Sequence, residues 1–370
     1  NAFIVPFIFV LPYEFIVVAL SACLLNSYFL KVKRQTVALA ALAAGYIVLC
    51  LTISMFGSLQ FWNMGLLVLA SLFVIAIQPK VLFFAALLML PTNYLLSSET
   101  SVKEYGRNFF GIVQVIDIPF NQFVLRYLNS GSTAHGIEQI SPKIDLVPST
   151  YYSPSGPIGD VIQLERPANV GVIGLGAGTL ACHMAPDRHF TFYEINPLMP
   201  KLASWFYYFK HCGMPAIKIG DGRKLLEQAV DTRHDVLVVD AFTSDAIPVH
   251  LITKEAMQLY ADRISPNGVI ALHVTNRYYS LPQVAFAAAK AAGLKPYYKL
   301  FVPSDSEITA MPSLWVIAIK PEKSEKPYIK RGWGDRLTRE ISTWTDDYSN
   351  PLSALSWELI YLELKNVNQR

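Results

Sequence analysis

The sequence is poor in charged residues, and this scarcity is confined to its first part. Asp, Glu, Lys and Arg make up 16% of the 370 residues, whereas soluble domains average roughly 25%. Nearly all of the deficit falls before Ser97, so the apolar excess is local. The net charge is only +3 and the basic residues are scattered, which argues against nucleic acid as a partner.

Cysteine is also scarce, with 4 residues and no CxxC spacing among them. Two of the four lie in apolar segments. We therefore expect small buried side chains, and neither a disulfide framework nor a zinc site. The histidines show no ligand spacing, so the sequence predicts no metal site. The cysteines are Cys23, Cys50, Cys182 and Cys212.

The start of the chain lacks the basic leader of a signal peptide, because an apolar run follows Asn1 directly. Four apolar stretches then precede the soluble part, each about the length that crosses a hydrocarbon core of ~30 Å. Backbone groups in lipid must be satisfied internally, so these stretches predict helices. We expect a transmembrane α-helical region over residues 1–98, with the lipid bilayer as a partner, that begins within something larger. The stretches are roughly 15–30, 37–56, 61–77 and 81–96.

From Ser101 the pattern changes to strands and turns. After Arg166, short apolar strands alternate with helices of about ten residues, which implies a mostly parallel sheet covered on both faces. The sequence therefore predicts an α/β Rossmann-like, methyltransferase-type domain over residues 166–325. A small β-rich N-terminal subdomain would precede it at 99–165, and a C-terminal extension would follow at 326–370.

Three glycines stand where the first of these strands turns into a helix. Gly174, Gly176 and Gly178 lie in the run Val-Ile-Gly-Leu-Gly-Ala-Gly-Thr-Leu. Glycine permits a tight turn and lets backbone N–H groups approach a ligand, and the start of a helix favours electron-rich groups. By itself such a turn is a weak signal.

Acidic residues stand at the ends of the next three strands. Glu194 follows the second strand, Asp221 and Gly222 the third, and Asp240 the fourth. One such residue is explained equally well as a helix cap, but three after a glycine turn favour a nucleoside at the carboxyl edge of the sheet. A dinucleotide oxidoreductase is the competing use of the turn. Asp221 and Asp240 disfavour it, because their positions suit an adenosyl ligand without pyrophosphate.

At these residues the sequence resembles the spermidine synthase family, and more closely its membrane-fused bacterial branch of fused transporter-like/spermidine synthase proteins. The resemblance covers nearly the whole chain, and it implies a multi-pass protein of the bacterial inner membrane. Further spans precede this point in that branch, which implies that they are missing here or belong to a separate chain. The segments that carry the resemblance include 1–15, 107–111, 131–139, 148–152 and 344–348.

The resemblance implies that decarboxylated S-adenosylmethionine, or a related nucleoside, is a co-substrate rather than a tightly bound cofactor. Its aminopropyl group would pass to an amine such as putrescine. By position, Gln139 would contact the nucleoside, Glu194 the ribose and Asp221 the adenine, with Gly222 and the glycine turn beside them.

The resemblance also implies catalytic residues. Asp240 would act near the reacting amine, because a protonated diamine must lose a proton before its nitrogen attacks the carbon next to sulfonium. Asp245 in the same loop is a second candidate. Tyr151 and Tyr152 stand where the family places an active-site Tyr, and we expect one to face the pocket, with Tyr151 as the candidate, and the other to pack.

Three departures from the family pattern concern the amine half of the site. Ala177 stands in the glycine turn where soluble members carry an Asp that holds the donor's ammonium. Asp240 and Asp245 are separated by four residues, whereas the family's acceptor loop has two closely spaced acids. A late Tyr is replaced near residues 311–313. A desolvated cation without its carboxylates is costly, so the sequence predicts an altered acceptor site.

Several other polar residues have two interpretations. Asp346 and Asp347 either close the pocket from the C-terminal side or cap a helix. His135 is either a proton shuttle or a packing residue. The basic stretch 320–330 is either solvated or rests on anionic headgroups.

Two functions stay open from the sequence. One is a membrane-anchored aminopropyltransferase-like enzyme. The other is a catalytically altered accessory or structural subunit of a larger membrane complex with other integral-membrane subunits. Transport is disfavoured, because the apolar stretches carry no charge beyond Glu14. The connectors with Lys33 and Lys80 favour an external soluble part, whereas S-adenosyl nucleotides are kept in the cytoplasm, so the side of the membrane is open as well.

Overall fold

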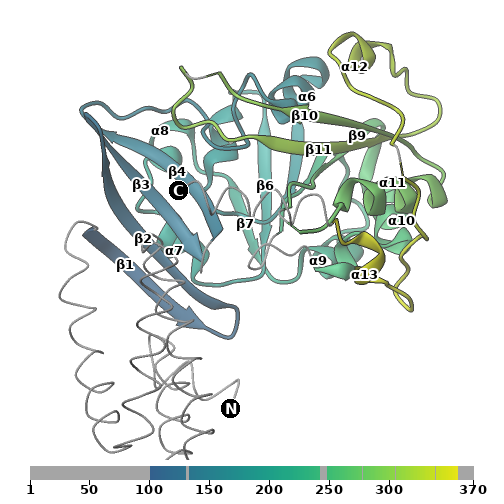
Figure 1. Cartoon of the computed structure of the whole chain (residues 1–370), viewed down its shortest axis with the longest axis horizontal. Coiled ribbons are helices and arrows are strands. Elements are labelled where there is room, and N and C mark those ends of the chain that lie inside the picture. The colour runs from purple at the N-terminus through teal and green to yellow at the C-terminus, as the bar shows by residue number, and fades with distance from the viewer. Residues whose placement is uncertain are drawn as a thin grey trace, which may run out of the picture. The chain divides into compact units, whose positions relative to one another are not determined.

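The computed structural model describes residues 101–130, 133–241, 248–276, 278–304, 306–337 and 339–356 (Figure 1). The apolar stretches predicted within residues 1–98 lie outside these ranges. In the part that is described, no helix combines the length and the hydropathy of a bilayer-crossing segment. The chain divides into two compact units, one of which consists of residues 101–106 and 112–369. The boundaries predicted at residues 98, 165 and 325 stay predictions.

The first sheet has four strands in the order β1-β2-β3-β4. β2 and β3 run antiparallel, as do β3 and β4. Val113 and Val115 of β2 are both buried, as expected for alternate residues that point to one face of a strand. The strands are β1 (Ser101–Asn108), β2 (Gly111–Phe120), β3 (Phe123–Ser130) and β4 (Thr133–Ser141).

The second sheet has seven strands in the order β10-β11-β9-β8-β5-β6-β7. The strands β5 to β9 pair in parallel, and β11 pairs antiparallel with both of its neighbours. This layout is the Rossmann-like, methyltransferase-type sheet that the sequence predicted. β6 and β7 lie on one side of β5, and the chain then crosses over to place β8 on the other side of β5. Ligands of open α/β sheets bind at the carboxyl ends of the strands where the order reverses in this way. The strands are β5 (Asn169–Ile173), β6 (His189–Glu194), β7 (Ala216–Ile219), β8 (His234–Val239), β9 (Ile264–His273), β10 (Lys295–Phe301) and β11 (Ser313–Ile319).

Helices cover both faces of the second sheet, because its strands are apolar on both sides. Val172 points into a core that includes residues of α6 (Pro157–Glu165), α7 (Met199–Ala203) and α8 (Tyr208–Cys212). Ile173, the next residue, points into the opposite core with residues of three other helices. These are α9 (Gly222–Gln228), α10 (Lys254–Arg263) and α11 (Leu281–Ala291).

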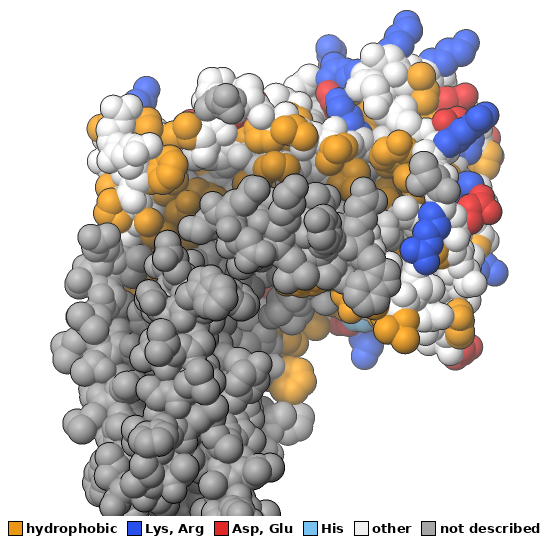
Figure 2. All heavy atoms as spheres, viewed as in Figure 1, with side chains coloured by type: hydrophobic (Ala, Val, Ile, Leu, Met, Phe, Trp, Pro, Cys, Tyr) orange, Lys and Arg blue, Asp and Glu red, His pale blue; other side chains and the backbone are white. Residues whose placement is uncertain are grey.

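The basic stretch 320–330 contains the short helix α12 (Lys326–Lys330), around which Lys and Arg side chains gather on the face seen in Figure 2. One of its lysines is not simply solvated. Lys323 Nζ lies 2.6 Å from a carboxylate oxygen of Glu165 at the end of α6, and it also donates to the Asn267 carbonyl at 2.7 Å. Part of this stretch is therefore fixed to the fold. The last described helix is α13 (Pro351–Ala354).

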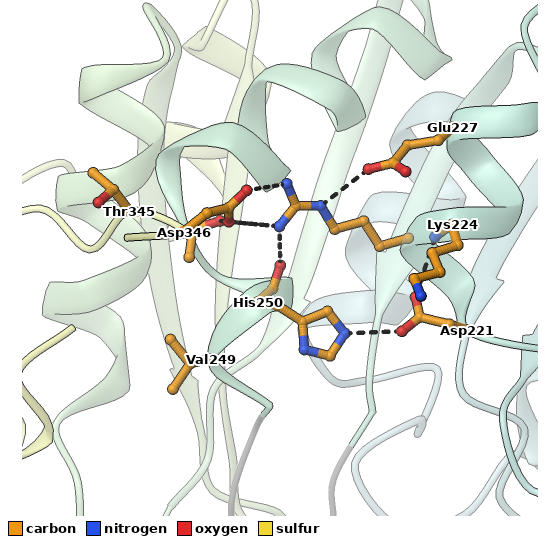
Figure 3. A pocket seen from close by; sticks show the side chains of 9 residues that line it. Asp221, Lys224, Glu227, Val249, His250, Thr345 and Asp346 are labelled. Atoms are coloured by element: carbon orange, nitrogen blue, oxygen red, sulfur yellow. Dashed lines mark hydrogen bonds and ion pairs between the residues drawn. The ribbon is translucent and has the colours of Figure 1, made fainter. Parts of the chain in front are cut away.

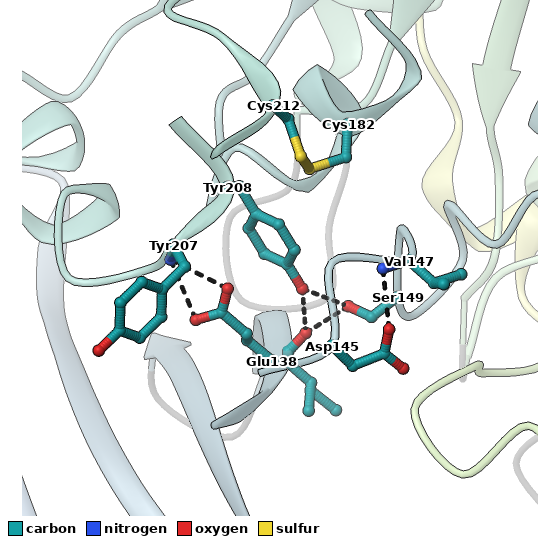
Figure 4. The surroundings of a disulfide bond; sticks show 9 residues. Glu138, Asp145, Val147, Ser149, Cys182, Tyr207, Tyr208 and Cys212 are labelled. Atoms are coloured by element: carbon teal, nitrogen blue, oxygen red, sulfur yellow. Dashed lines mark hydrogen bonds between the residues drawn. A yellow bond between two sulfur atoms is a disulfide. The ribbon is translucent and has the colours of Figure 1, made fainter. Parts of the chain in front are cut away.

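Cys182 and Cys212 form a disulfide, with their Cα atoms 4.8 Å apart (Figure 4). The expectation of unpaired buried cysteines is wrong for this pair, while Cys23 and Cys50 lie outside the described residues. Cys182 belongs to the 3-10 helix η1 (Thr179–His183), and Cys212 ends α8. The pair is 30 residues apart in sequence without a motif, so only the packing of η1 against α8 brings the two sulfur atoms together.

Candidate active site

The glycine turn between β5 and η1 is tightly enclosed by other parts of the fold. Gly174, Gly176 and Gly178 all have positive φ angles, of 101°, 55° and 79°. A Cβ on Gly176 would lie 2.7 Å from the His135 carbonyl oxygen, and one on Gly174 would collide with the Asp240 carbonyl. The turn therefore needs glycine for both conformation and space. It leads into a five-residue 3-10 helix rather than the α-helix predicted, so little helix dipole is available there.

Glu194 is the last residue of β6, and its side chain binds the backbone of the glycine turn. Its carboxylate accepts the N–H of Leu175 at 2.8 Å and the N–H of Asn196 at 2.7 Å. Burial raises the pKa of Glu194, and these backbone N–H groups partly offset that rise. The structure thus places Glu194 against the turn, where the sequence placed the ribose-binding acid. The contact with ribose itself stays a prediction.

Asp221 lies at the neighbouring strand end, before α9. One carboxylate oxygen accepts the Lys224 N–H at 3.1 Å and so caps the helix. The other lies 3.2 Å from Nε2 of His250 in the 3-10 helix η2 (Val249–Leu251). Among the residues described, Asp221 and Glu194 therefore have no hydrogen-bond or ion-pair partner in common. The adenine contact of Asp221 stays a prediction.

A pocket of about 560 Å³ opens beside Asp221 (Figure 3), a size that suits a small-molecule ligand. Its far wall is the C-terminal segment with Thr345 and Asp346. The Asp346 carboxylate binds the Arg223 guanidinium through two contacts of 2.7 and 2.6 Å, and it accepts the Thr253 hydroxyl at 2.8 Å. Asp346 thus lines this pocket, but the residues of the glycine turn, Glu194 and Asp240 do not, so closure of the nucleoside site by Asp346 stays a prediction.

Asp240 follows β8 and is the centre of a buried polar cluster. One carboxylate oxygen accepts the hydroxyl of Tyr152, and the other lies 2.8 Å from Nδ1 of His273 at the end of β9. The side chain of Asp240 is only 3% exposed. Asp240 also donates its backbone N–H to the Ile173 carbonyl at 2.9 Å, next to Gly174. The cluster therefore lies directly beside the glycine turn.

The two tyrosines complete this cluster in different ways. Tyr152 is buried, whereas Tyr151 is half-buried and stacks on the His273 ring with centroids 4.1 Å apart. Burial, and then the negative charge of Asp240, raise the pKa of both hydroxyls. Both therefore stay protonated near neutral pH and act as hydrogen-bond donors. Tyr152 donates a hydrogen bond to Asp240, while Tyr151 is the more accessible of the two tyrosines.

Comparison of the sequence with known proteins gives two relatives that share one described activity. No protein-family model matches the chain. A polyamine aminopropyltransferase of Vibrio vulnificus is 23% identical over 238 residues, which cover 62% of this chain and 77% of that protein. A probable polyamine aminopropyl transferase of Bifidobacterium longum is 22% identical over 204 residues, 54% of this chain and 44% of that protein. The resemblance to the spermidine synthase family is thus supported at the level of sequence similarity to these two proteins.

Solved structures similar to this one include spermidine synthases. A probable spermidine synthase from Corynebacterium glutamicum has a TM-score of 0.48 and 12% identity, over 68% of this chain and 99% of that chain. The spermidine synthase from Thermotoga maritima has a TM-score of 0.44 and 14% identity, over 72% and 87%. The membrane-fused branch of the spermidine synthase resemblance stays a prediction.

The position at which soluble spermidine synthases carry an Asp is filled differently here. Ala177 is 1% exposed, and its N–H donates to the His135 carbonyl at 3.3 Å. A Cβ added to Gly136 would collide with the Ala177 side chain. Strand β4 thus occupies the space beside residue 177. The backbone carbonyl of His135 takes part in this contact, whereas the choice between a proton shuttle and a packing residue concerns its side chain and stays a prediction.

Gln139, another of the predicted binding residues, is less closely joined to the site. Gln139 of β4 donates its side-chain amide to the Lys143 carbonyl at 3.0 Å, while β4 reaches the glycine turn through His135 and Gly136. The nucleoside contact of Gln139 stays a prediction. Asp245 lies outside the described residues. Gly222 begins α9, and a Cβ there would lie 2.6 Å from Cγ2 of Ile173, so it permits close packing of the helix on β5.

His273 and Thr275 were not predicted from the sequence. β8 and β9 are paired in register, with Val239 opposite Leu272, so the next residues of the two strands are Asp240 and His273. The rule used for the acids would have found this histidine, because it ends the next parallel strand at the same edge of the sheet.

Proposed function

We propose that the described part of the chain binds an S-adenosylmethionine-derived nucleoside at the carboxyl edge of the larger sheet and transfers an aminopropyl group from it to an amine. The observation that carries this proposal is the buried Asp240 cluster directly beside the glycine turn. The similarity to polyamine aminopropyltransferases supports it.

The chemistry requires one base and no redox change. An amine is protonated near neutral pH and must lose a proton before its nitrogen attacks the carbon next to sulfonium. Asp240 takes that proton: an N–H bond breaks and an O–H bond forms on the carboxylate. The C–N bond forms while the C–S bond breaks, and sulfur leaves as the neutral thioether of methylthioadenosine. The protonated hydroxyl of Tyr152 holds the carboxylate in place.

Recognition of the donor nucleoside at this site is proposed to differ from that in soluble spermidine synthases. Ala177 offers no carboxylate for the donor's ammonium, and β4 fills the space next to it. A cation placed there without a partner loses solvation and gains no ion pair. We therefore expect weaker discrimination between decarboxylated S-adenosylmethionine and the nucleoside methylthioadenosine than a carboxylate in the turn would give.

Calorimetric titration of the detergent-purified 370-residue chain tests the binding half of the proposal. Decarboxylated S-adenosylmethionine, S-adenosylmethionine and methylthioadenosine are the ligands. We expect heat of binding with decarboxylated S-adenosylmethionine and methylthioadenosine, with affinities within about tenfold of each other, a difference of about 1.4 kcal/mol. A folded sample that gives no heat with any of the three contradicts the proposal.

A second candidate function has one observation in its favour. Disulfides persist mainly in oxidising compartments, and the Cys182–Cys212 bond is typical of a domain outside the cytoplasm, away from the donor nucleoside. In this case the chain is an accessory subunit of a larger assembly in the bacterial inner membrane. Native purification distinguishes the two: constant co-purification with other membrane subunits favours the accessory role, and an active single-species preparation counts against it.

A further inference from the structure

We propose that His273 is a positioning residue for Asp240, held in one tautomer by Thr275. This inference rests on the proposed function, in which Asp240 is the base. The Nδ1 atom of His273 lies 2.8 Å from the Asp240 carboxylate, and its Nε2 atom lies 2.7 Å from Oγ1 of Thr275. His273 is 4% exposed, so these protein groups, rather than bulk water, set its hydrogen bonding.

The partners of the ring fix where its proton lies. A carboxylate only accepts hydrogen bonds, so Nδ1 carries the hydrogen and donates it to Asp240. Nε2 of the neutral ring is then an acceptor and takes the Thr275 hydroxyl hydrogen. The Thr275 oxygen in turn accepts the Leu314 N–H at 2.8 Å. The Thr275 hydroxyl also lies 3.5 Å from the Leu314 carbonyl, but the 2.7 Å contact with Nε2 is much the shorter, and in this arrangement the groups from Leu314 to Asp240 are satisfied in series.

The series matters for the proposed transfer because it orients the base. Tyr152 and His273 donate to different oxygens of the Asp240 carboxylate and so fix its plane. When the amine gives up its proton, an O–H bond forms on that carboxylate, the C–N bond forms and the C–S bond to sulfonium breaks. In this scheme His273 acts through Asp240 and not on the amine or the nucleoside. Its contribution is the direction of the Asp240 lone pairs.

Packing alone is the competing explanation for this histidine. The rings of Tyr151 and Trp315 both stack on His273, with centroids 4.1 and 4.9 Å away. A phenylalanine would keep these ring contacts and remove the N–H donor. An asparagine would remove the ring and keep an N–H group near the place of Nδ1. The two explanations therefore predict opposite orders of activity for the two variants.

The experiment compares His273→Asn and His273→Phe in the 370-residue chain, with decarboxylated S-adenosylmethionine and a panel of diamines. We expect kcat of the Phe variant to fall by about 10²-fold with an unchanged KM for the nucleoside, the scale of a general-base contribution. The Asn variant should keep kcat within about tenfold of the wild type. If the Phe variant instead has the higher kcat of the two, packing explains the role of His273 and the inference is wrong.

Thr275→Val and Thr275→Ser give a second comparison that leaves the ring in place. The Ser variant keeps the hydroxyl on Nε2, and we expect normal kcat, whereas the Val variant should lose at least about tenfold in kcat with its melting temperature still measurable. Equal activity of the two overturns the tautomer argument. If the wild type itself releases no methylthioadenosine, the proposed function fails, which is a result distinct from an active wild type with unaffected variants.

Discussion

Asp240 is the residue on which the proposed chemistry depends, because its buried carboxylate has the position and the partners of a base. Asp240→Asn keeps a side chain of the same shape and removes the proton acceptor. We expect nucleoside affinity within a few-fold of the wild type, and turnover lower by about 10²-fold or more. Calorimetry and methylthioadenosine release measure the two effects. Asp262→Asn, at an exposed position of α10, is the matched control and should change neither.

Glu138 on β4 is a buried acid whose charge state affects stability rather than chemistry. It is 0% exposed, and burial raises the pKa of Glu138 to about 8, although the Tyr207 N–H and Arg126 oppose the rise. The raised folded-state pKa means that the folded protein holds a proton which the unfolded chain releases above pH ~4.3. Stability is thus full below that pH and is lost as the pH rises toward about 8.

Glu138→Gln tests this sign, because it keeps an acceptor for Tyr207 and cannot ionise. Between pH 5 and pH 9, we expect the melting temperature of the wild type to fall relative to that of the variant. Parallel pH profiles for the two proteins would show that Glu138 does not change its protonation on folding in this range.

Single residues differ in how far the sequence could predict them. Glu194 and Asp240 were predicted from their places at strand ends, and they lie beside the glycine turn. The contacts of His273 with Asp240 were not predicted, because the prediction rested only on the acidic residues at the strand ends. Asp221 was predicted at the right strand end, but its pairing with His250 depends on a loop conformation that periodicity does not report.

At the scale of elements, the contact between β4 and the glycine turn should tolerate little change. Gly136→Ala places a Cβ against the Ala177 side chain, and overpacking of this kind costs about 1–3 kcal/mol. Ala177→Gly removes the opposing methyl group. We expect the double variant to recover part of the melting temperature lost by Gly136→Ala alone. Additive losses would show that the two residues are not in contact.

Strands were the most predictable elements, because short apolar runs that alternate with helical segments fit few arrangements other than a mostly parallel sheet. The position of β11 between β9 and β10 could not be read from periodicity, since an antiparallel strand has the same apolar pattern as its parallel neighbours. The helix expected after the glycine turn is only the 3-10 helix η1, which is linked to α8 by the disulfide.

At the scale of the whole molecule, the Cys182–Cys212 bond links the segment after the glycine turn to α8. α8 in turn contacts β4, where the Tyr208 hydroxyl donates to the Ile137 carbonyl at 2.6 Å (Figure 4). We expect reductant to lower the unfolding free energy by about 2–4 kcal/mol. A Cys182→Ser/Cys212→Ser variant should be less stable than the wild type and insensitive to reductant. A wild type whose melting temperature ignores reductant would contradict this expectation.

The most direct test of the proposed function is release of methylthioadenosine from decarboxylated S-adenosylmethionine, measured by mass spectrometry with a panel of amines. The account predicts release that depends on both the amine and Asp240, together with an aminopropylated amine in equal amount. A folded chain that binds the nucleoside but releases no methylthioadenosine with any amine would contradict the assignment of Asp240 as a base.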